Sequence, residues 1–165
     1  MLRMARRVLV FLKVANWVVG AAIIVFMTFA GFVAHERIMA AIARNNDGVD
    51  PAAMITFIHI SLLFMPLAIA LSHLIFRSLL EMIDSIPTDQ VFTYANANRL
   101  LLIAWALLGF SVAEHVYGFL SLHYVGQLAA WSPSLTGWLV SLLLFVLASV
   151  WKQGVAMRTE LEGTV

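Results

Sequence analysis

Residues 52–76 read AAMITFIHISLLFMPLAIALSHLIF and contain no Asp, Glu, Lys or Arg. An apolar stretch of about 20 residues is long enough to cross the hydrocarbon core of a bilayer as a helix. Within lipid, the backbone satisfies its polar groups only as a helix or a closed barrel. The stretch therefore predicts a transmembrane helix. Pro66 predicts a kink in it, because proline removes a backbone donor and crowds the carbonyl of Leu62.

Three more apolar runs lie on either side of this segment, at residues 8–33, 100–122 and 135–151. The chain has 165 residues, of which 62% are hydrophobic and 12% are charged, and its mean hydropathy is +0.94. A soluble domain is nearer half apolar and a quarter charged. We therefore expect one all-α domain over residues 1–165, an integral membrane bundle of four transmembrane helices.

The first run follows a basic leader, a pattern that is also typical of a cleaved signal peptide. Thr28, Phe29 and Ala30 form a weak candidate cleavage site. The apolar core of a signal peptide is roughly 7–15 residues long, which is shorter than the run at residues 8–33. We therefore predict an uncleaved first transmembrane helix.

The polar segment after the first run has apolar residues at helical spacing. These residues are Ile38, Met39, Ile42 and Ala43. The spacing predicts that the first helix continues past the membrane or that a helix lies on the membrane surface. Asp50 and Pro51 predict the N-cap and first residue of the second helix, and Ser132 and Pro133 predict the same for the fourth.

The basic residues near the span ends predict the orientation of the chain, since cytoplasmic loops are enriched in Lys and Arg. With four spans, one side holds both termini and the middle loop, and the other side holds only Arg37 and Arg44. The first side carries Arg3, Arg6, Arg7, Lys13, Arg77, Arg99, Lys152 and Arg158. We predict a multi-pass protein of the bacterial inner membrane with both termini in the cytoplasm.

Several classes of function are disfavoured by the composition. The net charge of +1 argues against direct binding of nucleic acid, which needs a clustered basic face. The chain has no cysteine, so thiolate catalysis and Cys-based metal sites are excluded. It also lacks a phosphate-binding loop, a zinc-protease motif and a nucleophile elbow. The sequence predicts no enzyme and nominates no cofactor.

Polar and small residues inside the spans indicate which helix faces are interior. On the third helix, Ser111, Glu114, Gly118 and Ser121 share one face. The first helix has a comparable stripe of Asn16, Gly20, Met27 and Gly31. The second has His59, Leu63, Pro66, Ala70, His73 and Arg77. The fourth has Gly137, Ser141, Ala148 and Lys152.

Glu114 is the most costly of these residues in a membrane, and it is followed by His115, with His59 expected at a similar depth. A Glu–His pair would lower the cost of burying either group. One hypothesis is a small transporter or a proton- or ligand-responsive site formed by Glu114, His59 and His115. The alternative is a neutral, hydrogen-bonded Glu114 that fixes helix register.

The histidines allow two further interpretations. A single haem between His59 and His115 would make the chain a membrane redox protein. A metal site near the outer surface would gather His35, Glu36, His115 and His123. Histidines at span ends and packed interfaces explain the same positions without any bound group.

The stretch Phe92-Thr93-Tyr94-Ala95-Asn96-Ala97-Asn98-Arg99-Leu100, continuing through Ile103 to Trp105, resembles a known motif. It precedes the third helix in a bacterial membrane family catalogued as domain of unknown function 2975. The tail from Gly154 to Val165, with its acidic stretch and terminal Thr-Val, resembles the end of that family. Val91 stands where the family often has proline, and Leu101 where a basic residue is common.

The resemblance implies four spans and a regulatory role. Family members often look like the membrane partner of a small helix-turn-helix regulator, so the resemblance implies a membrane sensor or anchor for such a DNA-binding protein. Phe92, Asn96 and Arg99 would then form a cytoplasmic interaction motif. The alternative is that Asn96 and Arg99 cap the third helix and fix it at the lipid headgroups.

Overall fold

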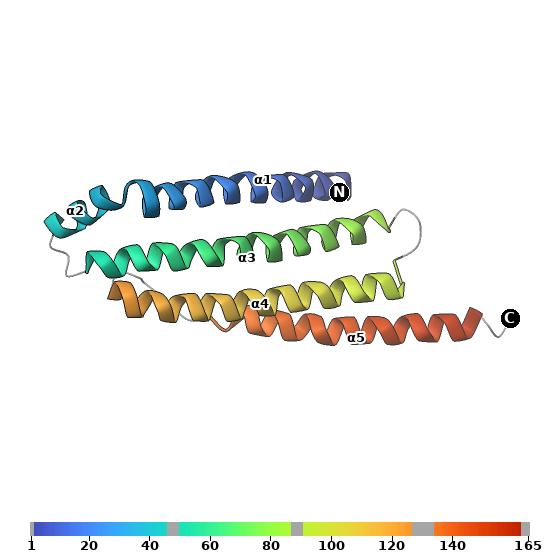
Figure 1. The fold of residues 1–165 in the computed structure, drawn as a ribbon. Coiled ribbons are helices and arrows are strands. Elements are labelled where there is room, and N and C mark those ends of the chain that lie inside the picture. The colour runs from blue at the N-terminus through green and yellow to red at the C-terminus, as the bar shows by residue number, and fades with distance from the viewer. Residues whose placement is uncertain (1, 46–49, 87–90, 127–133, 163–165) are drawn as a thin grey trace. The chain divides into compact units, whose positions relative to one another are not determined.

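The computed structural model describes residues 2–45, 50–86, 91–126 and 134–162, and all its regular structure in these ranges is helical. Figure 1 shows the elements in chain order. They are α1 (Leu2–Thr28), the π-helical turn η1 (Phe29–Val33), α2 (His35–Asn45), α3 (Pro51–Asp84), α4 (Tyr94–Val125) and α5 (Thr136–Glu162). The prediction of an all-α chain is confirmed.

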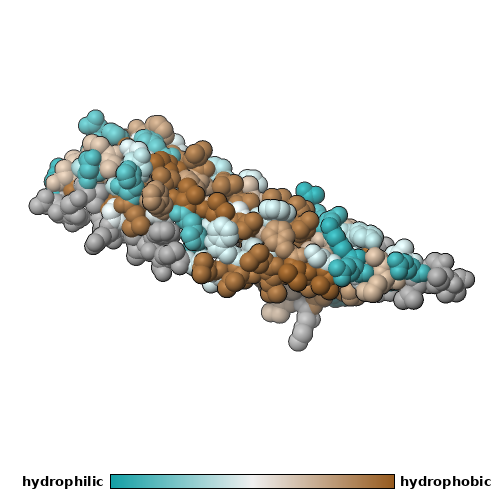
Figure 2. Space-filling view, turned by 90° about the horizontal axis from the view of Figure 1, so that it is seen from below, coloured by the Kyte–Doolittle hydropathy of each residue, from teal (hydrophilic) through white to brown (hydrophobic). Residues whose placement is uncertain are grey.

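Within the described ranges, four helical segments are long and apolar enough to cross a membrane. They are Leu2–Val33, Pro51–Asp84, Tyr94–Val125 and Thr136–Glu160. In the face drawn in Figure 2, hydrophobic residues cover broad areas that are separate from the hydrophilic ones. The helices are longer than the apolar runs within them: α3 has 34 residues and is thus about 51 Å long. That length exceeds the roughly 30 Å hydrocarbon core of a bilayer, and the charged residues Arg77, Glu81 and Asp84 all lie in about the last two turns of the helix.

The ends of the second long helix follow the sequence signals. The Asp50 carboxylate accepts a hydrogen bond of 3.0 Å from the backbone N–H of Ala52, and Pro51 is the first residue of α3. Asp50 is therefore the predicted N-cap. Pro66 lies inside α3, as predicted. The predicted turn at Ser132 and Pro133 lies outside the described residues, and α5 begins at Thr136.

The first helix does not continue unchanged into the next polar segment. The Ala34 N–H bonds to the Phe29 carbonyl at 2.8 Å, which closes the wider ring of a π-helical turn before α2 begins at His35. In α2, Ile38, Met39 and Ile42 are half-buried while Ala43 is exposed. The predicted helical spacing is confirmed, with α2 as a separate amphipathic helix.

The helices divide into two compact units. The first comprises Met1–Val14, Leu71–Ser111 and Leu135–Val165. In it, α3 and α4 are antiparallel: a Cβ on Gly109 would meet Leu71 at 3.5 Å, and Arg99 pairs with Glu81. Helix α5 packs on α4, where Ser111 approaches Gly137 so closely that a side chain there would clash. Apart from Asn96, the most buried residues in this unit are small: Ala97, Ala104, Ser141 and Ala148 are at most 1% exposed. Small residues allow this close helix contact.

The second unit comprises Ala15–Ala70 and Val112–Ser134. Here the Asn16 side-chain amide donates to the Ile69 carbonyl at 3.1 Å, and a Cβ on Gly20 would overlap the Ile69 side chain. The Ser61 and Tyr117 hydroxyl groups are 3.1 Å apart and join α3 to α4. Two phenylalanine rings of α3, Phe57 and Phe64, flank the Tyr117 ring at 5.2 and 5.5 Å.

The predicted interior stripe of the second helix is wrong in most of its members. Leu63 is 77% exposed, and Pro66, Ala70 and Arg77 are exposed as well. Helix α3 has neighbours on two sides, so its buried residues form two faces. Small and polar residues spaced along one stripe cannot indicate both faces. The buried residues of α3 are Ile55, Ser61, Ile69, Ser78 and Leu80.

Candidate functional site

The connection between α3 and α4 is built around Asn96, which is only 1% exposed. Its side-chain amide donates to the Ser85 hydroxyl at 2.8 Å and to the Val91 carbonyl at 2.8 Å. Its carbonyl oxygen accepts a bond of 2.7 Å from the Arg99 guanidinium. Both N–H donors of this buried amide are therefore used, as buried polar groups require. Asn96 ties the end of α3 to the start of α4.

Arg99 extends this cluster to the last turns of α3. Its Nε donates to Glu81 at 2.9 Å, and Glu81 also accepts from Arg77 at 2.8 Å. Hydrogen bonds from Arg77 and then Arg99 hold the pKa of Glu81 below its usual value. The Arg77 side chain is 63% exposed and that of Glu81 is 38% exposed, so solvent screens this pair and its contribution to stability is small.

The N-cap of α4 is Thr93. The backbone N–H of Asn96 donates to the Thr93 hydroxyl at 3.3 Å, one of the bonds that a capping side chain provides. Asn96 and Arg99 therefore join the start of α4 to the end of α3. The residue that caps α4 is Thr93. Ser85, Glu81 and Thr93 complete the cluster and were not identified from sequence. The only local signal was Thr93, a common capping residue directly before the start of α4. Ser85 and Glu81 precede Asn96 by 11 and 15 residues, so no local pattern connects them to it.

Aromatic side chains lie beside this polar cluster. Phe92 is 54% exposed, and its ring stacks on Trp151 of α5 with centroids 5.1 Å apart and an interplanar angle of 26°. Tyr94 is 52% exposed. The last turns of α5 carry exposed Met157 and buried Val155. Phe92, Tyr94 and Met157 are thus held on ordered helix ends with much of their apolar surface accessible.

A further ion pair lies in the same unit. Arg6 of α1 pairs with Asp84 of α3 at 2.7 Å, with side chains 56% and 49% exposed. The pair links the N-terminal turns of α1 to the last turn of α3. We call the residues that bring these three helix ends together, Arg6, Glu81, Asp84, Ser85, Asn96 and Arg99, the junction cluster.

The predicted intramembrane polar residues differ in their exposure. Glu114 is exposed on α4, although Ser111, Gly118 and Ser121 of the same predicted stripe are buried. Within the described residues, no ion pair or hydrogen bond joins Glu114 to His59. His115 is half-buried. The Glu–His pair therefore stays a prediction.

His59 lies against the π-helical turn. Its ring centroid is 4.6 Å from that of Phe32, and a Cβ on Gly31 would come within 3.1 Å of Nε2. Nε2 is buried and has no hydrogen-bond partner. The nitrogen faces backbone of the first span, so a haem iron between His59 and His115 would need this packing to open. No group of three His, Asp or Glu side chains in the described ranges is arranged to hold a metal ion.

Comparisons with known proteins give no relatives: no family model matches the chain, and no curated protein or solved structure is significantly similar.

Proposed function

We propose that this chain is a membrane-embedded regulatory anchor that binds a small helix-turn-helix DNA-binding protein at the end of the helices carrying the junction cluster. The observation that carries the proposal is the combination of a buried, fully bonded Asn96 with exposed aromatic residues immediately beside it. A polar cluster of this kind joins the end of α3 to the start of α4. A helix start held in this way can present Phe92 and Tyr94 to a partner at little entropic cost.

Three features support a soluble partner at this end. The basic residues near these helix ends outnumber those of the other loops, which by the positive-inside rule favours the cytoplasm. Phe92 and Tyr94 follow α3 in the chain and are more than half exposed. Tyr and Phe are enriched at protein interfaces. Helix α5 continues past Trp151 for three turns with exposed Met157. The partner class itself rests on the family resemblance.

The test is a pull-down of the tagged full-length chain from native membranes in a mild detergent, followed by mass spectrometry. We expect a stoichiometric helix-turn-helix protein with the wild-type chain. The Phe92→Ala variant and a chain truncated before Gly154 should lose it, because both remove surface around the junction cluster. Phe26→Ala is the matched control, since Phe26 is 68% exposed but belongs to the apolar part of α1. Equal recovery with all these chains would refute the proposal.

A second candidate function is proton sensing at His59, and the buried, unpartnered Nε2 is the observation that favours it. A protonated imidazole at this position would carry a donor without an acceptor, against Gly31 and Phe32. The variant His59→Phe should abolish any pH-dependent change in the conformation of the turn at residues 29–33. An identical pH dependence in wild type and variant would exclude His59 as a sensor.

A further inference from the structure

Helix α2 carries two stripes of opposite character. Its half-buried residues His35, Ile38, Met39 and Ile42 follow the i, i+3, i+4, i+7 spacing of one helix face. The same spacing on the other side gives the exposed stripe Arg37, Ala40, Ala41 and Arg44. An amphipathic helix with apolar residues on one side and arginines on the other is suited to the plane of a membrane surface.

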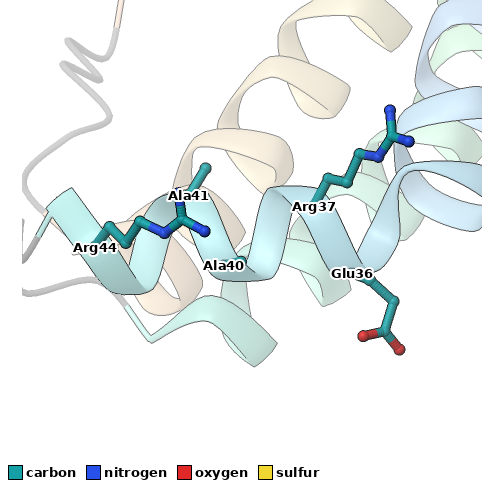
Figure 3. Close-up of a pocket in the computed structure, with 5 residues that line it drawn as sticks. All are labelled: Glu36, Arg37, Ala40, Ala41 and Arg44. Carbon is teal, nitrogen blue, oxygen red and sulfur yellow. The ribbon is translucent and has the colours of Figure 1, made fainter.

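A groove of about 340 Å³ lies on the exposed stripe, lined by Glu36, Arg37, Ala40, Ala41 and Arg44. Figure 3 shows the Arg44 side chain running back along α2 to Ala41, while Glu36 points away from both arginines. On this face of the helix, the two positions between the arginines are alanines, whose small side chains leave the groove open. A larger side chain at Ala40 or Ala41 would occupy part of the groove.

The two arginines are separated by seven positions, or about 10 Å along the helix axis. A guanidinium presents several N–H donors in a planar fork that matches phosphate oxygens. Two such forks can bind one phosphate group, either the free ion or an ester, when both side chains turn toward the groove. In the described part of the chain, neither Arg37 nor Arg44 forms an ion pair with a carboxylate.

The position of α2 in the chain points to the same ligand. Helix α2 begins two residues after the apolar segment Leu2–Val33 ends. That place corresponds to the level of lipid headgroups if the segment spans a bilayer. Arg37 and Arg44 are also the only Lys or Arg residues between Lys13 and Arg77, so they do not belong to a general basic surface.

We propose that the groove between Arg37 and Arg44 on α2 binds a phosphate group, either in a lipid headgroup or as the free ion. Arg44 contacts the phosphate over Ala41, and Arg37 closes the other end by rotation of its exposed side chain. The site is independent of the proposed anchor function, because it uses no residue of the junction cluster.

Two probes distinguish the sources of phosphate. The purified full-length chain in mild detergent is titrated with dioleoyl phosphatidylglycerol and followed by native mass spectrometry. The same chain is titrated with inorganic phosphate and followed by calorimetry. Saturable binding of the lipid alone identifies a headgroup site, and saturable binding of inorganic phosphate identifies a site for the free ion. Either result supports the proposal.

Variants then locate the binding. The double variant Arg37→Gln/Arg44→Gln should bind the active probe at least about tenfold more weakly, because it loses charge-assisted hydrogen bonds. Ala41→Met keeps both charges, fills the groove and should weaken binding to a similar extent. Arg3→Gln/Arg7→Gln is the matched control, since it removes two exposed charges from α1 and should bind like wild type.

Circular dichroism and gel filtration check that each variant is folded. If the double variant fails these checks, Ala41→Met alone decides the matter, because methionine is compatible with an exposed helical position. Wild-type binding of both probes no stronger than that of Ala41→Met would overturn the proposal. Equal weakening by the Arg3→Gln/Arg7→Gln control would also overturn it, because the effect would then be one of overall charge.

Discussion

At the scale of single residues, Asn96 illustrates how a buried amide organises its surroundings. Its side chain forms hydrogen bonds with Ser85, Val91 and Arg99, which come from the end of α3, the segment before α4 and α4 itself. Removing one partner from such a set leaves buried donors and acceptors without a bond, and each orphaned group costs more than a hydrogen bond contributes. The sequence singled out Asn96 as an interaction or capping residue. Its role in joining two helix ends was not predicted, because nothing in the sequence pairs Asn96 with Ser85.

We predict that Asn96→Ala destabilises the protein by about 1–3 kcal/mol, the cost of leaving such buried polar groups unsatisfied. Asn98→Ala is the matched control, because Asn98 is exposed two residues further along the same helix. Thermal unfolding in detergent, followed by circular dichroism, should show a lower Tm for Asn96→Ala and little change for Asn98→Ala. Equal Tm values for the two variants would show that the junction cluster does not stabilise the fold.

Glu81 adds a pH dependence at the same scale. Hydrogen bonds from Arg77 and Arg99 lower the pKa of Glu81 in the folded protein, so its contribution to stability is present above the unfolded pKa. That contribution is lost as the pH falls through the lowered folded value. We expect the difference in Tm between wild type and Glu81→Gln to be largest near neutral pH and to shrink below about pH 4. A difference that stays constant from pH 7 to pH 3 would contradict this assignment.

At the scale of helices, hydropathy and capping signals explain most of what was predictable. The four apolar runs correspond to α1 with η1, α3, α4 and α5, and the Asp50 cap was predicted correctly. The prediction of interior faces succeeded on α4 for Ser111, Gly118 and Ser121, which all lie against neighbours. It failed for Glu114 and for α3, since the side a neighbour occupies is a long-range property. A stripe of small residues indicates that a helix has a packed face. It does not indicate where along the helix the contact ends.

Two glycines provide a test of helix packing. Gly20 is buried against the Ile69 side chain, whereas nothing lies within 4 Å of a Cβ placed on Gly154. We therefore expect Gly20→Val to lower the Tm, because its side chain forces α1 and α3 apart. Gly154→Ala should raise stability by about 0.5–1 kcal/mol, since alanine replaces glycine within a helix. A stable Gly20→Val variant with unchanged thermal unfolding would show that α1 and α3 can separate at this contact without cost.

At the scale of the whole molecule, the large exposed apolar surface has a simple explanation. Only 6% of the apolar window of Leu2–Val33 is buried, and Phe11, Phe26 and Val25 are more than two-thirds exposed. A soluble monomer rarely exposes apolar patches of this extent, whereas lipid covers them without cost. The charged residues of the junction cluster lie within about eight residues of helix ends, and those of α2 lie outside the candidate spans. We predict that the junction cluster faces the cytoplasm, because most Lys and Arg residues lie on its side of the four predicted spans.

The chain contains no cysteine, so its orientation is open to a clean labelling test with single cysteines. We predict that cysteines at Ala95 and Met157 react with a membrane-impermeant maleimide only from the cytoplasmic side, because both positions are exposed beyond the apolar windows near the basic helix ends. A cysteine at Ala43 of α2 should react only from the opposite side. A cysteine at Leu143 should react only after solubilisation, since it is 66% exposed but lies in the middle of an apolar helix. Labelling of Ala43 and Ala95 from the same side would exclude the arrangement of four spans with both termini in the cytoplasm, and it would place the phosphate groove and the junction cluster on one membrane surface.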